Sequence, residues 1–223
     1  MATINKINRE SDPFTIDPGA SGDAYIQFNI NGTGEFRIGV DDDASDAFKI
    51  SQGSALGTND TFVMTADGIM TLPLNPAFIN EQNTESSVTG DGTVHSYGSV
   101  TATTSVVDRN SDMTEGNGAG TPATFTAPLT GLYYLQWSMN ANGNPVPSWI
   151  GYITTSNRTY RFINSPGRQA SFNFFGQTGF LCFSGGVIAD MDASDTAIWY
   201  YVGSSGTKNS SLNGVTLSGY LIG

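Results

Sequence analysis

The sequence predicts an all-β protein, with a small antiparallel β unit followed by a larger β-sandwich. Two observations lead to this prediction. Apolar residues alternate with a period of two along many short segments, and no segment keeps the 3.6-residue period of an amphipathic helix. Turn-forming clusters of Gly, Asn, Pro and Ser separate these segments at short intervals. The 223 residues are enough for one large β domain or two small ones.

The first unit is expected within residues 1–72. Segments 24–30 (AYIQFNI) and 35–40 (EFRIGV) each place three apolar side chains on one face. The pair Asn31-Gly32 lies between them and tolerates the positive φ of a tight hairpin turn. Residues 61–73 (TFVMTADGIMTLP) read as a second hairpin, folded at Asp67-Gly68.

Residues 73–93 are expected to form a neck or linker. This stretch and the residue before it (LPLNPAFINEQNTESSVTGDGT) contain two prolines, many polar side chains and little periodicity. A short helical turn over 77–82 is the one regular element that the stretch suggests.

Residues 94–223 are expected to form the larger domain, because their apolar segments are longer and more aromatic. Short strands at this spacing over some 130 residues are typical of a sandwich or jelly roll. The expected strands are 94–108, 122–127, 131–140, 148–155, 158–164, 171–176, 178–189, 195–202 and 213–222.

The segment GLYYLQWSM (131–139) is apolar on one face and partly aromatic on the other. Tyr133, Leu135, Trp137 and Met139 share one face, and Leu132, Tyr134, Gln136 and Ser138 share the other. Burial on both sides is expected for such a strand, one side in the sandwich core and the other against a further subunit. The C-terminal segment GVTLSGYLIG repeats the pattern, with Val215, Leu217 and Leu221 on one face and Tyr220 and Ile222 on the other.

Three motifs in this domain resemble a known family. FTAPLTGLYYLQWSM, DTAIWYYVG and LSGYLIG together resemble the globular head of complement-one-q, one of the tumour necrosis factor-like jelly rolls. The resemblance implies a ten-stranded jelly roll over residues 94–223 that assembles as a tight homotrimer. It places strands 131–135 and 217–222 near the threefold axis. The interface residues that it implies are Tyr133, Tyr134, Leu135, Leu217, Tyr220 and Ile222.

The first unit has a resemblance of its own. FRIGVDDDASDAFKISQGSALGTNDTFVMTADG, and FKISQGSALGTNDTF within it above all, resembles a segment of phage tail fibres and related virion appendages. The resemblance covers roughly residues 10–70. It implies a base or shaft segment that contacts other virion proteins.

Composition narrows the classes of partner and the location. The formal net charge of −11 disfavours nucleic-acid binding, which relies on basic patches. The N-terminus shows no signal-peptide pattern, and no apolar run reaches the roughly 18 residues of a membrane span. The single cysteine, Cys182, permits no internal disulfide. We therefore expect synthesis in a reducing host cytoplasm without a signal peptide, no membrane insertion, and a final place on a virion surface.

The sequence offers little acid–base or metal chemistry. The single histidine, His95, has no acidic residue in its own strand, so a structural or surface role is expected. No G-x-S-x-G nucleophile turn occurs, and no pair of carboxylates is fixed at a catalytic separation. The acids of GVDDDAS and ADMDASD suggest solvated turns or weak calcium sites, for which Asp41, Asp43, Asp190 and Asp192 are the candidate ligands. No other cofactor is expected.

Binding residues are expected where arginines and aromatic side chains lie close in sequence. The segment NRTYRFINSPGR and the loop before it contain Trp149, Arg158, Tyr160, Arg161 and Arg168. Aromatic faces stack on sugars, and guanidinium groups hold carboxylates, so these residues are candidates for receptor or glycan binding. The alternative is plain strand alternation, with the aromatic side chains inward and the arginines in solvent.

The function expected from these observations is that of a non-enzymatic, trimeric virion surface protein. It would be a fibre, a spike or a capsid-decoration knob that attaches to a host receptor or glycan, with three sites acting by avidity. Two alternatives remain open at this point. One is a glycan-depolymerising enzyme of the tailspike type, and the other is a secreted cellular recognition protein of the complement-one-q type.

Overall fold

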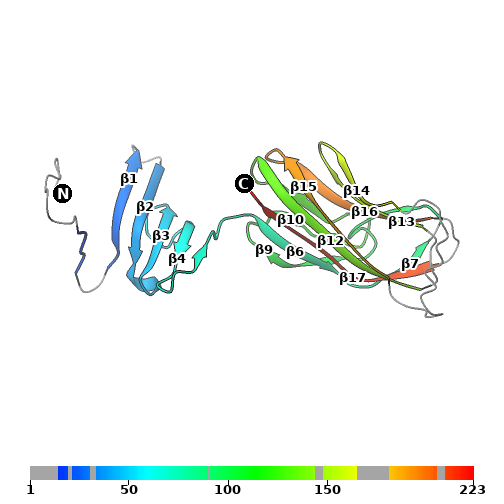
Figure 1. Cartoon of the computed structure of the whole chain (residues 1–223), viewed down its shortest axis with the longest axis horizontal. Coiled ribbons are helices and arrows are strands. Elements are labelled where there is room, and N and C mark those ends of the chain that lie inside the picture. Colours follow the sequence, from blue (N-terminus) through cyan, green and yellow to red (C-terminus); the bar gives the residue numbers. More distant parts are fainter. Residues whose placement is uncertain are drawn as a thin grey trace. The chain divides into compact units, whose positions relative to one another are not determined.

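A computed structural model describes residues 15–19, 22–30, 34–89, 91–143, 148–164, 181–204 and 209–223 (Figure 1). The chain divides into two compact units, unit 1 (Met1–Asn75) and unit 2 (Pro76–Gly223). Every strand pairing is antiparallel, and the only helical element of the described part is a 3-10 turn, η1 (Asp42–Ala44). The all-β prediction is confirmed. No helix in these described ranges is long and apolar enough to cross a membrane.

Unit 1 is a five-stranded sheet with the strand order β1-β2-β3-β4-β5. The strands are β1 (Ala24–Ile30), β2 (Gly34–Asp41), β3 (Ala47–Gln52), β4 (Asp60–Met64) and β5 (Met70–Thr71). Both predicted hairpins are present, since β1 pairs with β2 and β4 pairs with β5. The turn between β4 and β5 contains Gly68 at a φ of 81°, as the Asp-Gly pair predicted.

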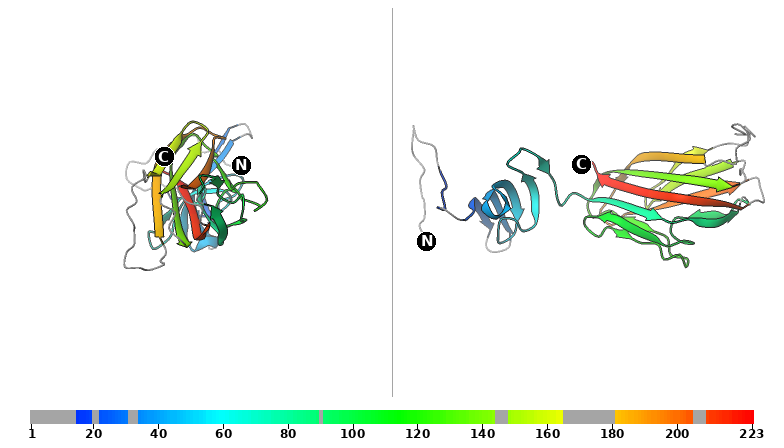
Figure 2. Two further views of the ribbon diagram at one scale, coloured as in Figure 1. Left: turned by 90° about the vertical axis from the view of Figure 1, so that its right-hand side faces the viewer. Right: turned by 90° about the horizontal axis from the view of Figure 1, so that it is seen from below.

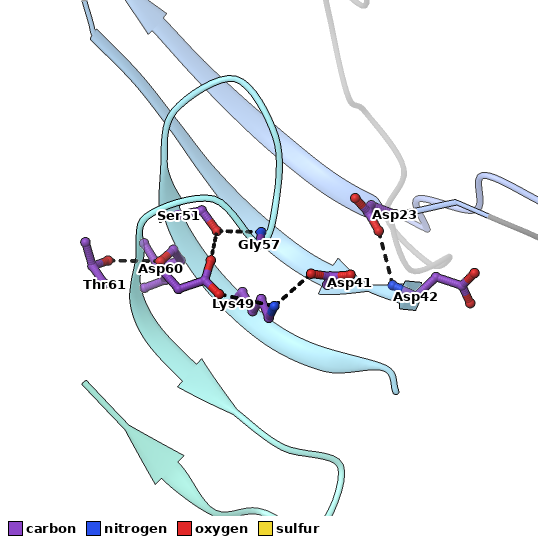
Figure 3. Close-up of polar contacts among 9 residues, drawn as sticks. Asp23, Asp41, Asp42, Lys49, Ser51, Gly57, Asp60 and Thr61 are labelled. Atoms are coloured by element: carbon purple, nitrogen blue, oxygen red, sulfur yellow. Dashed lines mark hydrogen bonds and ion pairs between the residues drawn. The ribbon is translucent and has the colours of Figure 1, made fainter. Parts of the chain in front are cut away.

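One face of this sheet is polar and buried. Arg37, Asp41, Lys49 and Ser51 each expose less than a tenth of their surface there, and Leu56 of the 53–59 loop is also buried. Figure 3 shows Asp41, Lys49 and Ser51 of this cluster, with Ser51 Oγ accepting a hydrogen bond from the backbone amide of Gly57 in that loop. The loop backbone comes so close to the sheet that a Cβ on Gly57 would lie 2.8 Å from Asp41 Oδ2.

Unit 2 is a sandwich of two antiparallel sheets (Figure 2). The β12 sheet has the order β15-β12-β17-β6-β9, and β7 also pairs with β17. The β16 sheet has the order β10-β11-β16-β13-β14, and β8 also pairs with β16. The strands of the β12 sheet are β6 (Ala77–Gln82), β7 (Glu85–Thr89), β9 (Thr103–Asp108), β12 (Gly131–Gly143), β15 (Leu181–Met191) and β17 (Asn209–Leu221). Those of the β16 sheet are β8 (Val94–Ser96), β10 (Met113–Thr114), β11 (Thr124–Thr126), β13 (Ser148–Thr155), β14 (Thr159–Asn164) and β16 (Thr196–Ser204).

The core lies between the two sheets and is rich in aromatic side chains. Phe78 of β6 stacks on Phe125 of β11 with ring centroids 4.8 Å apart, and it meets Trp199 of β16 edge-on. Burying each large apolar side chain of this kind contributes roughly 1.5–3 kcal/mol. The inward residues of β12 are Tyr133, Leu135, Trp137 and Met139, which the alternation had placed together on one face.

The expected neck is corrected by the structure. Residues 77–82 and 85–89 are strands of the β12 sheet, and the division between the units falls after Asn75. The inward side chains of β6 are Phe78, Asn80 and Gln82, all buried. Buried and exposed residues therefore alternate along β6. The sequence did not show this pattern, because two of the three inward residues are polar. The helical turn suggested for 77–82 is likewise a strand.

Two further strand expectations changed. The expected strand 94–108 is two strands, β8 and β9, with a turn over 97–102 between them, and they belong to different sheets. The expected strand 171–176 lies outside the described residues.

Candidate functional site

The outward face of the β12 sheet carries an exposed apolar area, which we call the outer patch. One row crosses three neighbouring strands, because Tyr134 pairs with Ile188 of β15 on one side and with Tyr220 of β17 on the other. Tyr220 is 50% exposed and Ile188 is 58% exposed. The outer patch comprises Ile79, Val107, Leu132, Tyr134, Ile188, Tyr220 and Ile222.

The aromatic centre of the outer patch is formed by Tyr134 and Tyr220. The rings of Tyr134 and Tyr220 are 5.5 Å apart between centroids, with an angle of 47° between their planes. Tyr134 also covers Gly186 of β15, where a Cβ would come within 2.5 Å of the tyrosine oxygen. A residue with a side chain at position 186 would therefore lift the ring from the sheet.

On β12, β15 and β17 the outer patch is confined to one end of the sheet. Farther along β12 and β17 the outward residues are polar, namely Gln136, Ser138, Ser218 and Thr216. The apolar end is the one where β12 begins and β17 ends. There Ile222 donates its amide to the carbonyl of Leu132 at 2.7 Å.

The predicted interface set is corrected in part. Tyr133, Leu135 and Leu217 have no exposed surface because they lie in the core of their own chain, and the Tyr133 hydroxyl donates to the Leu129 carbonyl at 2.7 Å. These three residues cannot contact another subunit. Tyr134, Tyr220 and Ile222 do lie on the outward face. Leu132 and Ile188 were not in the predicted set, although the alternation already placed Leu132 on the same face as Tyr134.

The outward face of the β16 sheet carries a second arrangement, a tyrosine–arginine row. Tyr152 of β13 pairs with Tyr200 of β16 on one side and with Arg161 of β14 on the other. The two rings stack with centroids 5.2 Å apart and planes 14° apart, and the Arg161 guanidinium lies 6.0 Å from the Tyr152 ring. Burial, and next the neighbouring Tyr200, raise the pKa of Tyr152, whereas Arg161 lowers it. A stacked aromatic pair beside a cation is suited to sugars and to acidic groups.

The predicted receptor residues do not form a single site. Tyr160 packs against the core, whereas Arg161 is exposed, because successive residues of a strand point to opposite faces. Arg158 lies instead over Tyr160, at 6.0 Å from its ring. Trp149 is paired through its backbone with Gly203, and its side chain lies outside the described residues, as does Arg168. Tyr152 and Tyr200 were not among the predicted residues. Strand pairing alone brings Tyr152 beside Arg161 and Tyr200 beside Tyr152.

The acids suggested for calcium have protein partners or lie in solvent. Asp41 Oδ2 is 2.8 Å from Lys49 Nζ, and Asp60 Oδ2 is 3.1 Å from the same nitrogen, so the ammonium group occupies the place of a cation (Figure 3). Burial lowers the pKa of Lys49, but the hydrogen bonds to both carboxylates outweigh it and the pKa is raised. Asp43 is exposed in η1.

The second acidic loop is closed by its own hydrogen bonds. Asp190 and Asp192 are exposed, and Asp195 Oδ2 accepts from the Asp192 amide at 2.9 Å and from Asn157 Nδ2 at 2.7 Å. Within the described ranges, no group of three or more His, Cys, Asp or Glu side chains could hold a metal ion.

The single histidine has an acidic partner from another strand. Nδ1 of His95 in β8 lies 3.3 Å from Oε1 of Glu85 in β7, and the His95 ring stacks on Tyr201 with centroids 5.4 Å apart. Glu85 Oε2 accepts hydrogen bonds from the Tyr201 hydroxyl and, at 2.8 Å, from Gln82 Nε2. Burial raises the pKa of Glu85, but the hydrogen bonds from His95, Tyr201 and Gln82 outweigh it, and the pKa lies below its usual range. This buried group joins the two sheets, and Glu85 was not among the candidate residues.

Comparisons with known proteins give remote likenesses. No family model and no curated protein matches the chain. The globular domain of zebrafish complement 1qA is 16% identical, with a TM-score of 0.41, over 66% of this chain and 98% of that one. Murine APRIL is 10% identical, with a TM-score of 0.42, over 66% and 99%. An exo-β-1,3-galactanase from Phanerochaete chrysosporium is 11% identical, with a TM-score of 0.23, over 87% and 68%. At these values no likeness assigns the chain to a family.

Proposed function

We propose that the chain is a non-enzymatic, homotrimeric surface protein of a virion that attaches to a host receptor or glycan. It would be a fibre, a spike or a capsid-decoration knob. The observation that carries the proposal is the outer patch on the β12 sheet. Monomeric proteins rarely leave wide apolar areas uncovered, and symmetric association of identical chains is a common way to cover them.

The position of the tyrosine–arginine row supports the attachment role. The two sheets of unit 2 turn their inner faces to a common core, so their outward faces lie on opposite sides of the sandwich. Association through the outer patch therefore leaves Tyr152, Tyr200 and Arg161 open to solvent in every copy. Three such sites on one rigid assembly raise the effective affinity for a clustered ligand without any new contact.

The buried Glu85–His95 pair supports a structural role for the only histidine. His95 exposes 12% of its side chain and Glu85 only 1%. The Glu85 carboxylate is already bonded to Tyr201 and Gln82, which holds it in one orientation. The pair is therefore better suited to holding the two sheets together than to exchanging protons with a bound glycan.

Association is tested by light scattering of the full chain. We expect three times the chain mass of 23.6 kDa, and we expect Tyr220→Asp to weaken association through unit 2 because the new carboxylate would be buried in an apolar contact. Thr216→Asp is the matched control, since it adds the same charge to the same face of β17 at its polar end. A monomeric wild-type protein, or equal effects of the two variants, would contradict the proposal.

Attachment is tested with a glycan array and with host surface polysaccharide. We expect binding without cleavage, and we expect Arg161→Ala to weaken it. Release of new reducing ends from the polysaccharide would instead support a glycan-depolymerising enzyme.

A further inference from the structure

The sheet of unit 1 has one face that the described residues of this unit leave uncovered. The strand registers align its apolar side chains in rows, such as Ile26–Ile38–Ile50 across β1, β2 and β3, which continues to Phe62 of β4. We call this surface the unit 1 apolar face. It comprises Ile26, Phe28, Ile30, Phe36, Ile38, Val40, Phe48, Ile50, Phe62, Met64 and Met70. It carries no charged side chain.

The exposure of this face is large for so small a unit. Phe28 is 58% exposed, Ile30 72% and Met70 67%, and Phe36 and Ile26 are each more than 40% exposed. With 150–250 Å² for a whole aromatic side chain, the uncovered apolar area is on the order of 500 Å². The largest apolar patch on a typical monomer is about 300–600 Å², and a stable interface needs about 800 Å² per partner. The apolar area exposed on this face is therefore more than half of the area that one partner buries in a stable interface.

Unit 1 also lacks an apolar core of its own. Among its described residues, the buried apolar side chains are Ala47 and Leu56. The rest of its buried side chains are polar or charged and lie on the opposite face, where Lys49 pairs with Asp41 and Asp60. The sheet therefore provides one apolar layer and lacks a second layer to pack against it. Obligate interfaces supply such a second layer, since they resemble a domain core cut in half.

We propose that the unit 1 apolar face packs against the same face of further copies of this chain, as an association site separate from the outer patch of unit 2. An exposed apolar face needs a partner when the chain folds. Other copies of the chain are present at that time, and each offers one identical face. The face is also compatible with itself, since it has no charge to repel its copy, and its polar side chain, Gln52 beside Phe36, is exposed at the end of β3. Each copy thus completes the core that its neighbour lacks.

The test uses the full chain carrying Tyr220→Asp, which is expected to weaken association through unit 2. We expect this variant to remain oligomeric by light scattering at a concentration of about 50 µM. Adding Ile26→Glu should raise the dissociation constant at least about tenfold and yield monomers, whereas adding Tyr25→Glu should leave it unchanged within about twofold. Tyr25 is 38% exposed and Ile26 is 44% exposed on the same strand, so the two positions are matched in exposure. Tyr25→Glu replaces a ring that lies 5.0 Å from the Arg37 guanidinium with a carboxylate that can pair with this cation. The two changes differ because successive residues face opposite sides of the sheet.

A milder variant and a folding control complete the experiment. Phe28→Thr keeps a β-forming residue and removes only the apolar contact, so it should also weaken association if the face is an interface. All three tryptophans lie in unit 2, and their fluorescence confirms that unit 2 stays folded in each variant. Amide hydrogen exchange of β2 and β3 gives the same check for unit 1.

The outcomes separate this proposal from the proposed function. A folded, monomeric Tyr220→Asp protein would overturn it, and a different protein would then have to cover the face. Equal effects of Ile26→Glu and Tyr25→Glu, or none from Ile26→Glu, would overturn it as well. If Ile26→Glu alone makes the otherwise unchanged chain monomeric, association through unit 2 fails and the unit 1 contact stands.

Discussion

The buried carboxylate of Glu85 connects the two sheets of unit 2, and Glu85→Gln tests how much that connection contributes. The carboxylate is contacted from both sheets, by Gln82 of β6 and by His95 and Tyr201 of β8 and β16. Hydrogen bonds to a charged acceptor contribute roughly 1.5–3 kcal/mol each, about twice those to a neutral one. The lowered pKa of Glu85 means that these bonds outweigh the cost of burying its charge. We expect the free energy of unfolding to fall by about 2 kcal/mol at pH 7.

The lowered pKa of Glu85 also determines how the destabilisation by Glu85→Gln depends on pH. A carboxyl group whose pKa is lower in the folded than in the unfolded chain stabilises the fold above its unfolded pKa, which is close to 4.5. That contribution disappears as the pH falls through the lower, folded pKa. The difference between the wild type and Glu85→Gln should therefore be largest near neutral pH and should shrink below about pH 4.

The assay is urea unfolding followed by tryptophan fluorescence, because Trp137 and Trp199 are buried in the core. Glu81→Gln is the matched control, since Glu81 is exposed on the outward side of neighbouring β6. Its unfolding free energy should stay within about 0.5 kcal/mol of the wild type. A similarly small effect of Glu85→Gln, or a difference that persists unchanged in acid, would refute the reasoning.

Three further changes address other parts of the structure. Lys49→Met leaves two carboxylates of unit 1 without their cation, and a loss of about 3 kcal/mol should appear as faster amide hydrogen exchange in β3. Gly151→Ala places a Cβ 2.7 Å from the Trp137 ring, so overpacking should lower the urea midpoint by the equivalent of about 1–3 kcal/mol. Arg161→Ala should leave unfolding unchanged within about 0.5 kcal/mol and weaken binding on a glycan array, because its guanidinium lies over the exposed edge of Tyr152. Unchanged amide exchange in Lys49→Met, an unchanged urea midpoint in Gly151→Ala, or unchanged glycan binding by Arg161→Ala would each contradict the corresponding expectation.

The sequence predicted the strands whose inward and outward residues differ in polarity. The alternation grouped residues 132–139 of β12 and the apolar residues of 215–222 by face as the structure does. It could not say which face of β12 was the core, because both carried large apolar side chains. The resemblance then assigned Tyr133 and Leu217 to an intersubunit contact, whereas both are buried within their own chain.

The sequence failed where buried residues are polar. Asn80 and Gln82 are buried in β6, so their strand read as a linker. Glu85 and His95 meet only because β7 and β8 lie at the same end of the sandwich, and spacing along the chain carries no signal of that. The acids of residues 41–43 suggested a cation, and the cation that Asp41 meets is Lys49, eight residues farther along. Pairing between distant strands decides such contacts.

The burial of Arg37 and Lys49 has a consequence for the effect of salt on assembly. They are the only basic residues among the described residues 15–75, and both are held on the loop-covered face. The exposed charged groups there are acids, namely Asp17, Asp42, Asp43, Asp46 and Asp67. Copies that gather around unit 1 bring these like charges together, and at an ionic strength of 0.1 M their repulsion extends over a Debye length of about 10 Å. Added salt should therefore strengthen the assembly, whereas an assembly held by ion pairs would loosen.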